Sequence, residues 1–215
     1  KRVVLNKQIE NAVFNMLQYS SNDATSFLID LLTGTTSGLS IEGAVWDQWK
    51  YQREIINDWL ISLEWDEVKE FNCCQKTWDD RPYGREKDFY DQNNKNRNSM
   101  STYGTAKILE AIILHKIYKE DNLKLKDFLF RHLSKDQMKR NDNQVKGFLG
   151  EGLPENTPFW SKAGLMSQAR HDAAWWLNNK YSQTLLVVFG NGEIFANDTA
   201  FFPELSQAIY KYNQQ

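Results

Sequence analysis

The chain has 215 residues, of which 41% are apolar and 25% are charged, so it is long and apolar enough to fold around a core. Its 26 basic and 28 acidic side chains give a net charge of −2, which provides no electrostatic reason to expect nucleic acid or an anionic membrane as a partner. No apolar run is long enough to span a bilayer. Cys73 and Cys74 are adjacent and the three histidines lie far apart, so we expect no disulfide, metal site or cofactor.

The first third of the chain has apolar residues at helical spacing, which predicts three helices. They cover residues 8–17, 24–33 and 45–63. The first two helices are separated by a polar turn, Ser20-Ser21-Asn22-Asp23. We expect Asp23 to cap the second helix and Gly34 to follow its last turn.

The middle of the chain contains a stretch with weak periodicity, residues 72–98, rich in aromatic side chains. A stretch of this length with many aromatic residues is typical of an ordered functional loop that packs on itself. Helical spacing resumes over residues 102–118 and 124–139.

The last third changes to a strand pattern rich in Trp, Phe, Val and Leu, followed by a helix over residues 198–213. We expect strands at residues 158–166, 167–179 and 183–192, joined as an antiparallel meander. Helices packed on one antiparallel sheet define an α+β fold. Three strands are few beside the typical five or six, so we expect residues 1–215 to be the C-terminal portion of a larger single domain.

The segment "SKAG" places Lys162 beside two small residues, Ala163 and Gly164, on a predicted strand. Small residues there let a substrate approach the backbone, and Arg170 on the next strand is suited to clamp a carboxylate. The alternative is that Lys162 and Arg170 are surface charges that protect a sheet edge from aggregation.

Two further groups have both a functional and a structural interpretation. The turn Ser21-Asn22-Asp23 presents a hydroxyl, an amide and a carboxylate, or it is an ordinary helix cap. Glu86, in the long stretch, is a candidate general base or a solvated carboxylate.

Taken in order, these segments resemble the class A serine β-lactamases and related penicillin-recognising enzymes. "SNDATSFLIDLL" resembles the family's Ser-Asp-Asn segment and the following helix, and "NRNSMSTYGTAKIL" resembles the end of its Ω-loop and the next helix. "SKAG" and the strand after it resemble the Lys-Thr-Gly strand and its neighbour. The resemblance covers nearly the whole chain and implies a serine hydrolase that forms an acyl-enzyme.

The resemblance implies a site made of a catalytic and a substrate-binding set. The catalytic set is Ser21, Asp23, Glu86 and Lys162, and the substrate-binding set is Ala163, Gly164 and Arg170. Ser21 would pass a proton to the leaving nitrogen, Lys162 would attract an anionic substrate, and Arg170 would bind its carboxylate.

Three departures from the family pattern bear on function. Asn22 and Asp23 stand in the reverse of the family order, and an ionised Asp23 cannot donate a hydrogen bond to a substrate carbonyl. Ala163 lacks the hydroxyl of the Lys-Thr-Gly strand, and direct counting places the Ω-loop glutamate on Arg85 rather than Glu86. No serine has a lysine three residues later, as the family's nucleophile does. We therefore expect the nucleophile to lie upstream of this chain and the chain alone to be inactive.

The resemblance implies a small-molecule substrate, a β-lactam or a related amide, and export from the cytoplasm. Three alternatives remain open at this point. One is another acyl hydrolase of the same fold, such as a D,D-peptidase, esterase or glutaminase. The second is a non-catalytic interaction domain that has kept the fold. The third is a helical binding module unrelated to this fold, which would require the three predicted strands to be wrong.

Overall fold

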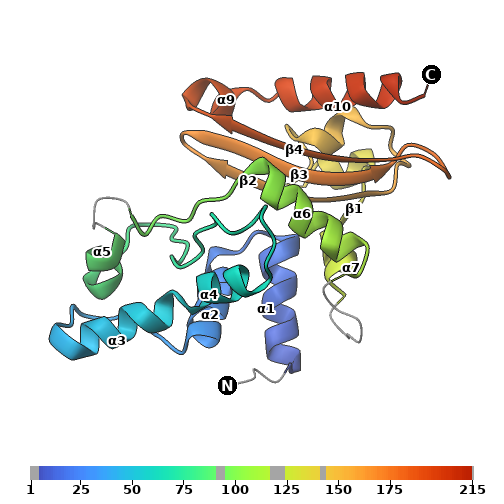
Figure 1. Ribbon diagram of the computed structural model, residues 1–215. Coiled ribbons are helices and arrows are strands. Elements are labelled where there is room, and N and C mark those ends of the chain that lie inside the picture. Colours follow the sequence, from blue (N-terminus) through green and yellow to red (C-terminus); the bar gives the residue numbers. More distant parts are fainter. Residues whose placement is uncertain (1–4, 91–94, 117–123, 141–143, 215) are drawn as a thin grey trace. The chain divides into compact units, whose positions relative to one another are not determined.

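The computed structural model describes residues 5–90, 95–116, 124–140 and 144–214 (Figure 1). These residues form two compact units. The helical unit comprises Lys1–Met16 and Ser21–Gly104, and the sheet unit comprises Leu17–Ser20 and Thr105–Gln215. Four residues of an otherwise helical region, Leu17–Ser20, thus belong to the sheet unit. None of the helices in the described part of the chain is both long and apolar enough to cross a membrane.

The helical unit is built from amphipathic helices. They are α1 (Lys7–Gln18, whose last two residues enter the sheet unit), α2 (Asn22–Thr33), α3 (Gly43–Arg53), α4 (Ile55–Ser62) and α5 (Gly84–Tyr90). The apolar sides of α1 and α2 pack together through Ile9, Ala12 and Leu28. This contact buries the stripe that the helical spacing predicts.

The cap of α2 corrects one expectation. Ser21, not Asp23, is the N-cap: its hydroxyl accepts a hydrogen bond from the Ala24 backbone N–H at 3.1 Å. Asp23 instead lies exposed in the first helical turn, where a carboxylate interacts favourably with the helix dipole. At the other end, Gly34 adopts the left-handed conformation (φ 70°) that the sequence predicts for it.

The predicted helix over residues 45–63 is two helices that meet at Glu54. The long stretch after them is ordered and contains α5. Asparagine side chains hold its ends: Asn98 Oδ1 accepts from the backbone N–H groups of Cys74 and Gln75 at 3.0 and 2.9 Å. Trp49 contributes to a small core beside it, stacking edge-on against Phe89.

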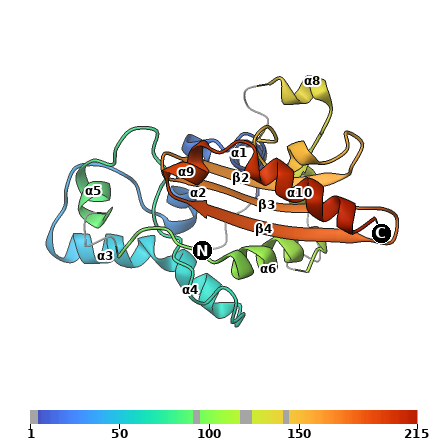
Figure 2. The same cartoon turned by 90° about the horizontal axis from the view of Figure 1, so that it is seen from above.

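The sheet unit contains a four-stranded antiparallel sheet in the order β1-β2-β3-β4 (Figures 1 and 2). The strands are β1 (Phe130–Arg131), β2 (Phe159–Met166), β3 (Ala169–Leu177) and β4 (Gln183–Asn191). The three longer strands confirm the predicted meander, and the fold is α+β as expected.

The two faces of the sheet are covered by different elements. On one face the 3-10 turn η1 (Leu149–Gly152) and α10 (Phe201–Tyr212), which follows the short α9 (Glu193–Asn197), pack over Phe159, Ala174 and Trp176. On the other face α6 (Thr102–Ile113) and α7 (Leu125–Leu129) pack over Ala173 and Trp175. Figure 1 shows α10 and α6 on opposite sides of the strands.

The helix predicted over residues 124–139 is wrong. The segment forms α7, then the short strand β1, then α8 (Lys135–Met138). Phe130 pairs with Trp160 and Arg131 with Phe159 across the sheet, so a partner about 30 residues away decides the local structure. The helix predicted over residues 102–118 ends at Ile113, and its residues 117 and 118 lie outside the described part of the chain.

Candidate functional site

Lys162 lies on β2 with its ammonium group between two oxygen atoms from distant parts of the chain. Its Nζ donates to Ser20 Oγ at 2.7 Å and to Gln144 Oε1 at 3.1 Å, and it also contacts its neighbour's carbonyl, Ala163 O. The sequence predicts a hydroxyl partner for Lys162, but the structure places Ser20 there, one residue before the predicted Ser21.

The segment Leu17–Ser20 is fixed to the sheet unit by side chains that satisfy the end of α1. The last carbonyls of a helix have no partner within the helix. Arg131 donates to Leu17 O at 2.5 Å and to Gln18 O at 2.6 Å, and Gln144 Nε2 donates to Gln18 O at 3.0 Å. Arg131 also contacts Ser161 O on β2, so one guanidinium joins the helix end to the strand that carries Lys162.

Ser20 has an unusual backbone conformation for its residue type. Its φ is +57°, in the left-handed region where glycine normally ends a helix. A residue with a Cβ pays about 1–2 kcal/mol in this conformation. Glycine would remove that strain but would also remove the hydroxyl that Lys162 contacts. Strain of this kind is concentrated at functional sites.

Buried charges surround the Lys162 ammonium group. Burial is the main cause that lowers its pKa from 10.5 to about 8; the positive charge of Arg131 adds to the decrease and the carboxyl group of Asp172 opposes it. Burial also lowers the pKa of Arg131 to about 10, again opposed by Asp172.

Asp172 lies on β3 opposite Ala163 and is completely buried. Burial raises the pKa of its carboxyl group from 3.8 to about 7, despite a hydrogen bond from Leu149 N at 3.0 Å and the charges of Lys162 and Arg131. Its second oxygen, Oδ1, has no hydrogen-bond partner among the described residues. No motif in the sequence marks this residue.

Glu86 is buried within the helical unit rather than solvated. Its Oε1 accepts hydrogen bonds from Arg53 at 2.6 Å and from Ser37 at 2.9 Å. Arg53 is itself completely buried and also lies 3.4 Å from Asp30. These contacts give Glu86 a structural role as the counter-ion of a buried guanidinium.

Arg170 is also held by protein groups. Its guanidinium donates to Gly147 O at 2.9 Å and to Ala196 O at 2.9 Å, and lies over the Phe148 ring. To bind a substrate carboxylate, as the sequence predicts, it would have to leave these buried partners. Its geometry favours a structural role.

Ala163 and Gly164 differ in their surroundings. The Ala163 methyl group is buried beneath the strand and supplies no hydroxyl. Gly164 is half-buried, and a Cβ added to it would meet only the His171 Cβ, at 3.9 Å. There is therefore room for a methyl group at Gly164.

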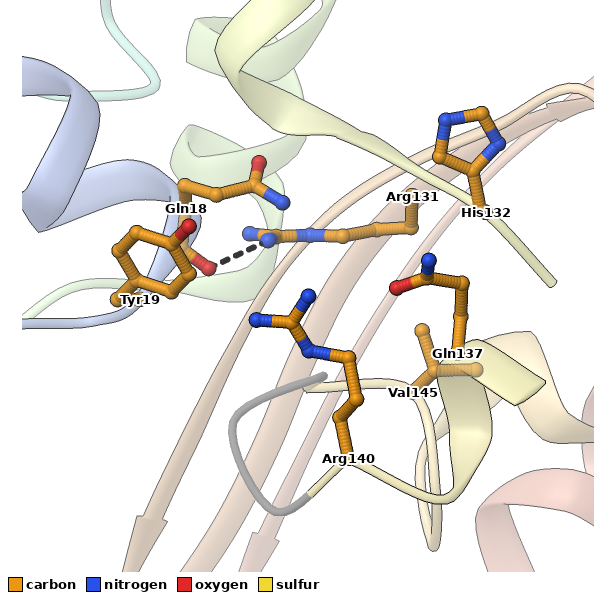
Figure 3. A pocket seen from close by; sticks show the side chains of 7 residues that line it. All are labelled: Gln18, Tyr19, Arg131, His132, Gln137, Arg140 and Val145. Carbon is orange, nitrogen blue, oxygen red and sulfur yellow. Dashed lines mark hydrogen bonds between the residues drawn. The ribbon is translucent and has the colours of Figure 1, made fainter. Parts of the chain in front are cut away.

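A small pocket of about 70 Å³ lies next to the Leu17–Ser20 segment (Figure 3). It is lined by Gln18, Tyr19, Arg131, His132, Gln137, Arg140 and Val145. Figure 3 shows the guanidinium ends of Arg131 and Arg140 both directed toward Gln18 and Tyr19, which gives this pocket a cationic wall. Among the described residues no group of three His, Cys, Asp or Glu side chains is arranged to hold a metal ion.

A model of the beta-lactamase enzyme family matches residues 5–213. The chain belongs to the beta-lactamase enzyme family. The resemblance predicted from the sequence is thus confirmed, and the match extends over both compact units. No curated protein matches the chain.

Solved β-lactamase structures share the fold at low sequence identity. They include a β-lactamase from Streptosporangium roseum (13% identity, TM-score 0.57), an ancestral (GNCA) class A β-lactamase (15%, 0.59) and a class A β-lactamase from Clostridium kluyveri (14%, 0.56). The matches cover 96%, 99% and 100% of this chain but 65%, 75% and 76% of those structures, respectively. The chain thus spans about two thirds to three quarters of their length.

The Ser-Asp-Asn segment of the β-lactamase family can be aligned with the polar turn in two registers, which begin at Ser20 or at Ser21. If Ser20 takes the first place of the Ser-Asp-Asn segment, the third place falls on Asn22, which restores the amide that the other register lacks. In that register Ser21 takes the middle place, where it caps α2. The signal was present in the sequence, because only the Ser20 register puts an amide third.

Proposed function

We propose that the chain provides the hydroxyl–ammonium part of an acyl-transfer site in a β-lactamase-like serine hydrolase. The observation that carries this proposal is the 2.7 Å contact between Lys162 Nζ and Ser20 Oγ, in a member of the β-lactamase family. The nucleophile is a serine outside these 215 residues, because no serine among them has a lysine three positions later.

In this mechanism the nucleophilic oxygen forms a bond to the carbonyl carbon of a β-lactam or related amide, and the C–N bond of the amide breaks. Ser20 donates its hydroxyl proton to the leaving nitrogen and takes up the proton that the nucleophilic hydroxyl releases, so that Ser20 is neutral again in the acyl-enzyme. Water then adds to the acyl carbon, the acyl–oxygen bond breaks, and the nucleophilic oxygen regains a proton from that water. Lys162 orients the Ser20 hydroxyl and attracts an anionic substrate. Because the pKa of Lys162 is lowered to about 8, this attraction weakens as the pH rises through that value. Backbone N–H groups of β2 near Gly164 stabilise the oxyanion.

An acyl hydrolase of different substrate range, such as a D,D-peptidase, esterase or glutaminase, is the second candidate. The buried Ala163 methyl group favours it, because the resemblance predicts a hydroxyl there as a donor to a substrate carboxylate. The substrate is a small molecule in either case, and export from the cytoplasm belongs to the same proposal.

A fluorescent penicillin, applied to the product of the gene that contains these residues, tests the proposal. Labelling followed by rapid release indicates a β-lactamase, and labelling without rapid release indicates a peptidase-like enzyme. If no covalent label forms under any condition, the chain is part of a non-catalytic interaction domain and the proposal is wrong. The isolated 215-residue chain should hydrolyse nitrocefin no faster than a heat-inactivated sample, and faster hydrolysis would show that the nucleophile lies within it.

Replacing the two serines separately distinguishes their roles. Ser20→Gly should leave the free energy of unfolding unchanged or higher, because glycine relieves the strained φ, yet should lower the pKa of Lys162 by removing a hydrogen-bond acceptor. Ser21→Ala should cost about 1 kcal/mol by removing the cap of α2 and leave the Lys162 titration unchanged. NMR titration of labelled lysine and urea unfolding measure the two effects. If Ser21→Ala rather than Ser20→Gly moves the Lys162 pKa, the assignment of Ser20 is wrong.

A further inference from the structure

Gln144 bridges the two groups that define the site. Its Oε1 accepts from Lys162 Nζ at 3.1 Å, and its Nε2 donates to Gln18 O at 3.0 Å. Gln18 lies two residues before Ser20, so a single amide connects the lysine on β2 to the segment that carries its hydroxyl partner.

The orientation of this amide is determined by its neighbours. An ammonium group can only donate and a backbone carbonyl can only accept, so the amide oxygen must face Lys162 and the amide nitrogen must face Gln18. No other uncharged side chain of this length offers both an acceptor and a donor. A carboxylate would repel the Gln18 carbonyl, and an apolar side chain would satisfy neither group.

Gln144 shares its backbone conformation with Ser20, the other side-chain acceptor of Lys162. Its φ is +42°, and that of Ser20 is +57°. Both residues carry a Cβ in a region that glycine adopts more readily. The described part of the chain contains four such non-glycine residues, and two of them are the side-chain acceptors of one ammonium group. This coincidence indicates that the side chains, and not the turns, are what these positions require.

We propose that Gln144 is a positioning residue that sets the direction of the Lys162 ammonium group toward the Ser20 hydroxyl. The inference rests on the proposed function, since it concerns how that hydroxyl–ammonium pair is held. Gln144 acts through Lys162 and does not need to contact the substrate. Arg131 and Asp172 are the charged groups near Lys162 on the neighbouring strands. The charge of Arg131 lowers the pKa of Lys162 and the carboxyl group of Asp172 raises it. Gln144 supplies the hydrogen bond that fixes its direction.

Titration of Lys162 in two Gln144 variants tests the proposal. The 215-residue chain is labelled with ¹³C-lysine, and Lys162→Arg identifies the Lys162 signal. Gln144→Glu should raise the Lys162 pKa by about one pH unit, because a carboxylate replaces a neutral acceptor. Gln144→Met should lower it, because the ammonium loses an acceptor without gaining another. If Gln144 had a purely structural role, both substitutions would shift the Lys162 pKa in the same direction or leave it unchanged.

Gln168 provides the matched control, because it is exposed on the turn between β2 and β3. Gln168→Glu and Gln168→Met should leave the Lys162 titration within experimental error of the unmodified chain. The proposal is overturned if both Gln144 variants titrate like the Gln168 variants while remaining folded by circular dichroism. The test does not require catalysis, so a failure of the penicillin-labelling experiment and a failure of this one are separate results.

Discussion

The completely buried carboxyl group of Asp172 should make the stability of the protein depend on pH. In the unfolded chain the pKa of this group is near its usual value of 3.8, whereas in the folded protein burial raises it to about 7. A raised acid pKa means that the folded state favours the protonated form. The contribution of Asp172 to the free energy of unfolding is therefore present in full below about pH 4. It decreases above that value and is lost as the pH rises through 7.

The size of this effect follows from the difference between the two pKa values. A difference of about three pH units corresponds to about 4 kcal/mol, which is the upper limit of the loss between pH 4 and pH 8. Asp172→Asn cannot ionise and keeps an oxygen that accepts from Leu149 N. Its amide N–H₂ group places unpaired donors where Oδ1 has no partner, at a cost of about 1–3 kcal/mol that does not vary with pH.

The test therefore compares how the free energy of unfolding of the two proteins changes with pH, and not its value at a single pH. We expect the free energy of unfolding of Asp172→Asn minus that of the unmodified chain to increase by up to about 4 kcal/mol from pH 4 to pH 8. Urea unfolding followed by tryptophan fluorescence at half-unit pH steps measures it, and Asp136→Asn on the exposed α8 is the control. A flat difference across this range would refute the reasoning, since it would show that Asp172 ionises as readily in the folded protein as in the unfolded chain.

Two further substitutions test the buried contacts outside the site. Arg53→Met leaves Glu86 buried without its counter-ion and should lower the free energy of unfolding by about 3–5 kcal/mol. The double variant with Glu86→Gln should restore much of this loss. A double-mutant cycle with no coupling energy would contradict the pairing. Gly152→Ala should prevent normal folding, because its Cβ would lie 1.9 Å from Pro203 O, whereas Gly164→Ala, with 3.9 Å of clearance, should melt within a few degrees of the unmodified chain.

The fold was largely predictable because its main elements have regular patterns. The three strands after residue 157 alternate or run apolar in the expected way, and α2 ends at Gly34 as expected. The strand β1 was not predictable, because two residues carry no periodicity and their strand state depends on pairing with Phe159 and Trp160. The break between α3 and α4 at Glu54 was not predicted, because the apolar residues on both sides of it keep helical spacing.

The site was predictable only where a motif names the residue. Lys162 was predicted because "SKAG" has a recognisable pattern, and the hydroxyl that it contacts in the structure is that of Ser20, one residue before the predicted Ser21. Gln144, Arg131 and Asp172 belong to no motif, and their contacts are with residues that lie elsewhere in the sequence. Composition alone cannot distinguish a buried charge near a site from an ordinary surface charge.

The end of α1 places a serine at residue 20 in a left-handed backbone conformation that glycine would adopt with less strain. The helix ends at this point, and the carbonyls of Leu17 and Gln18 accept from Arg131 and Gln144, which belong to the same unit. Those bonds hold the backbone at Ser20 in place, and the left-handed conformation then directs its hydroxyl at Lys162. A glycine would end the helix equally well but would leave the ammonium group with one side-chain acceptor fewer. The proposed role of Ser20 as the hydroxyl partner of Lys162 would account for a strained residue at this position.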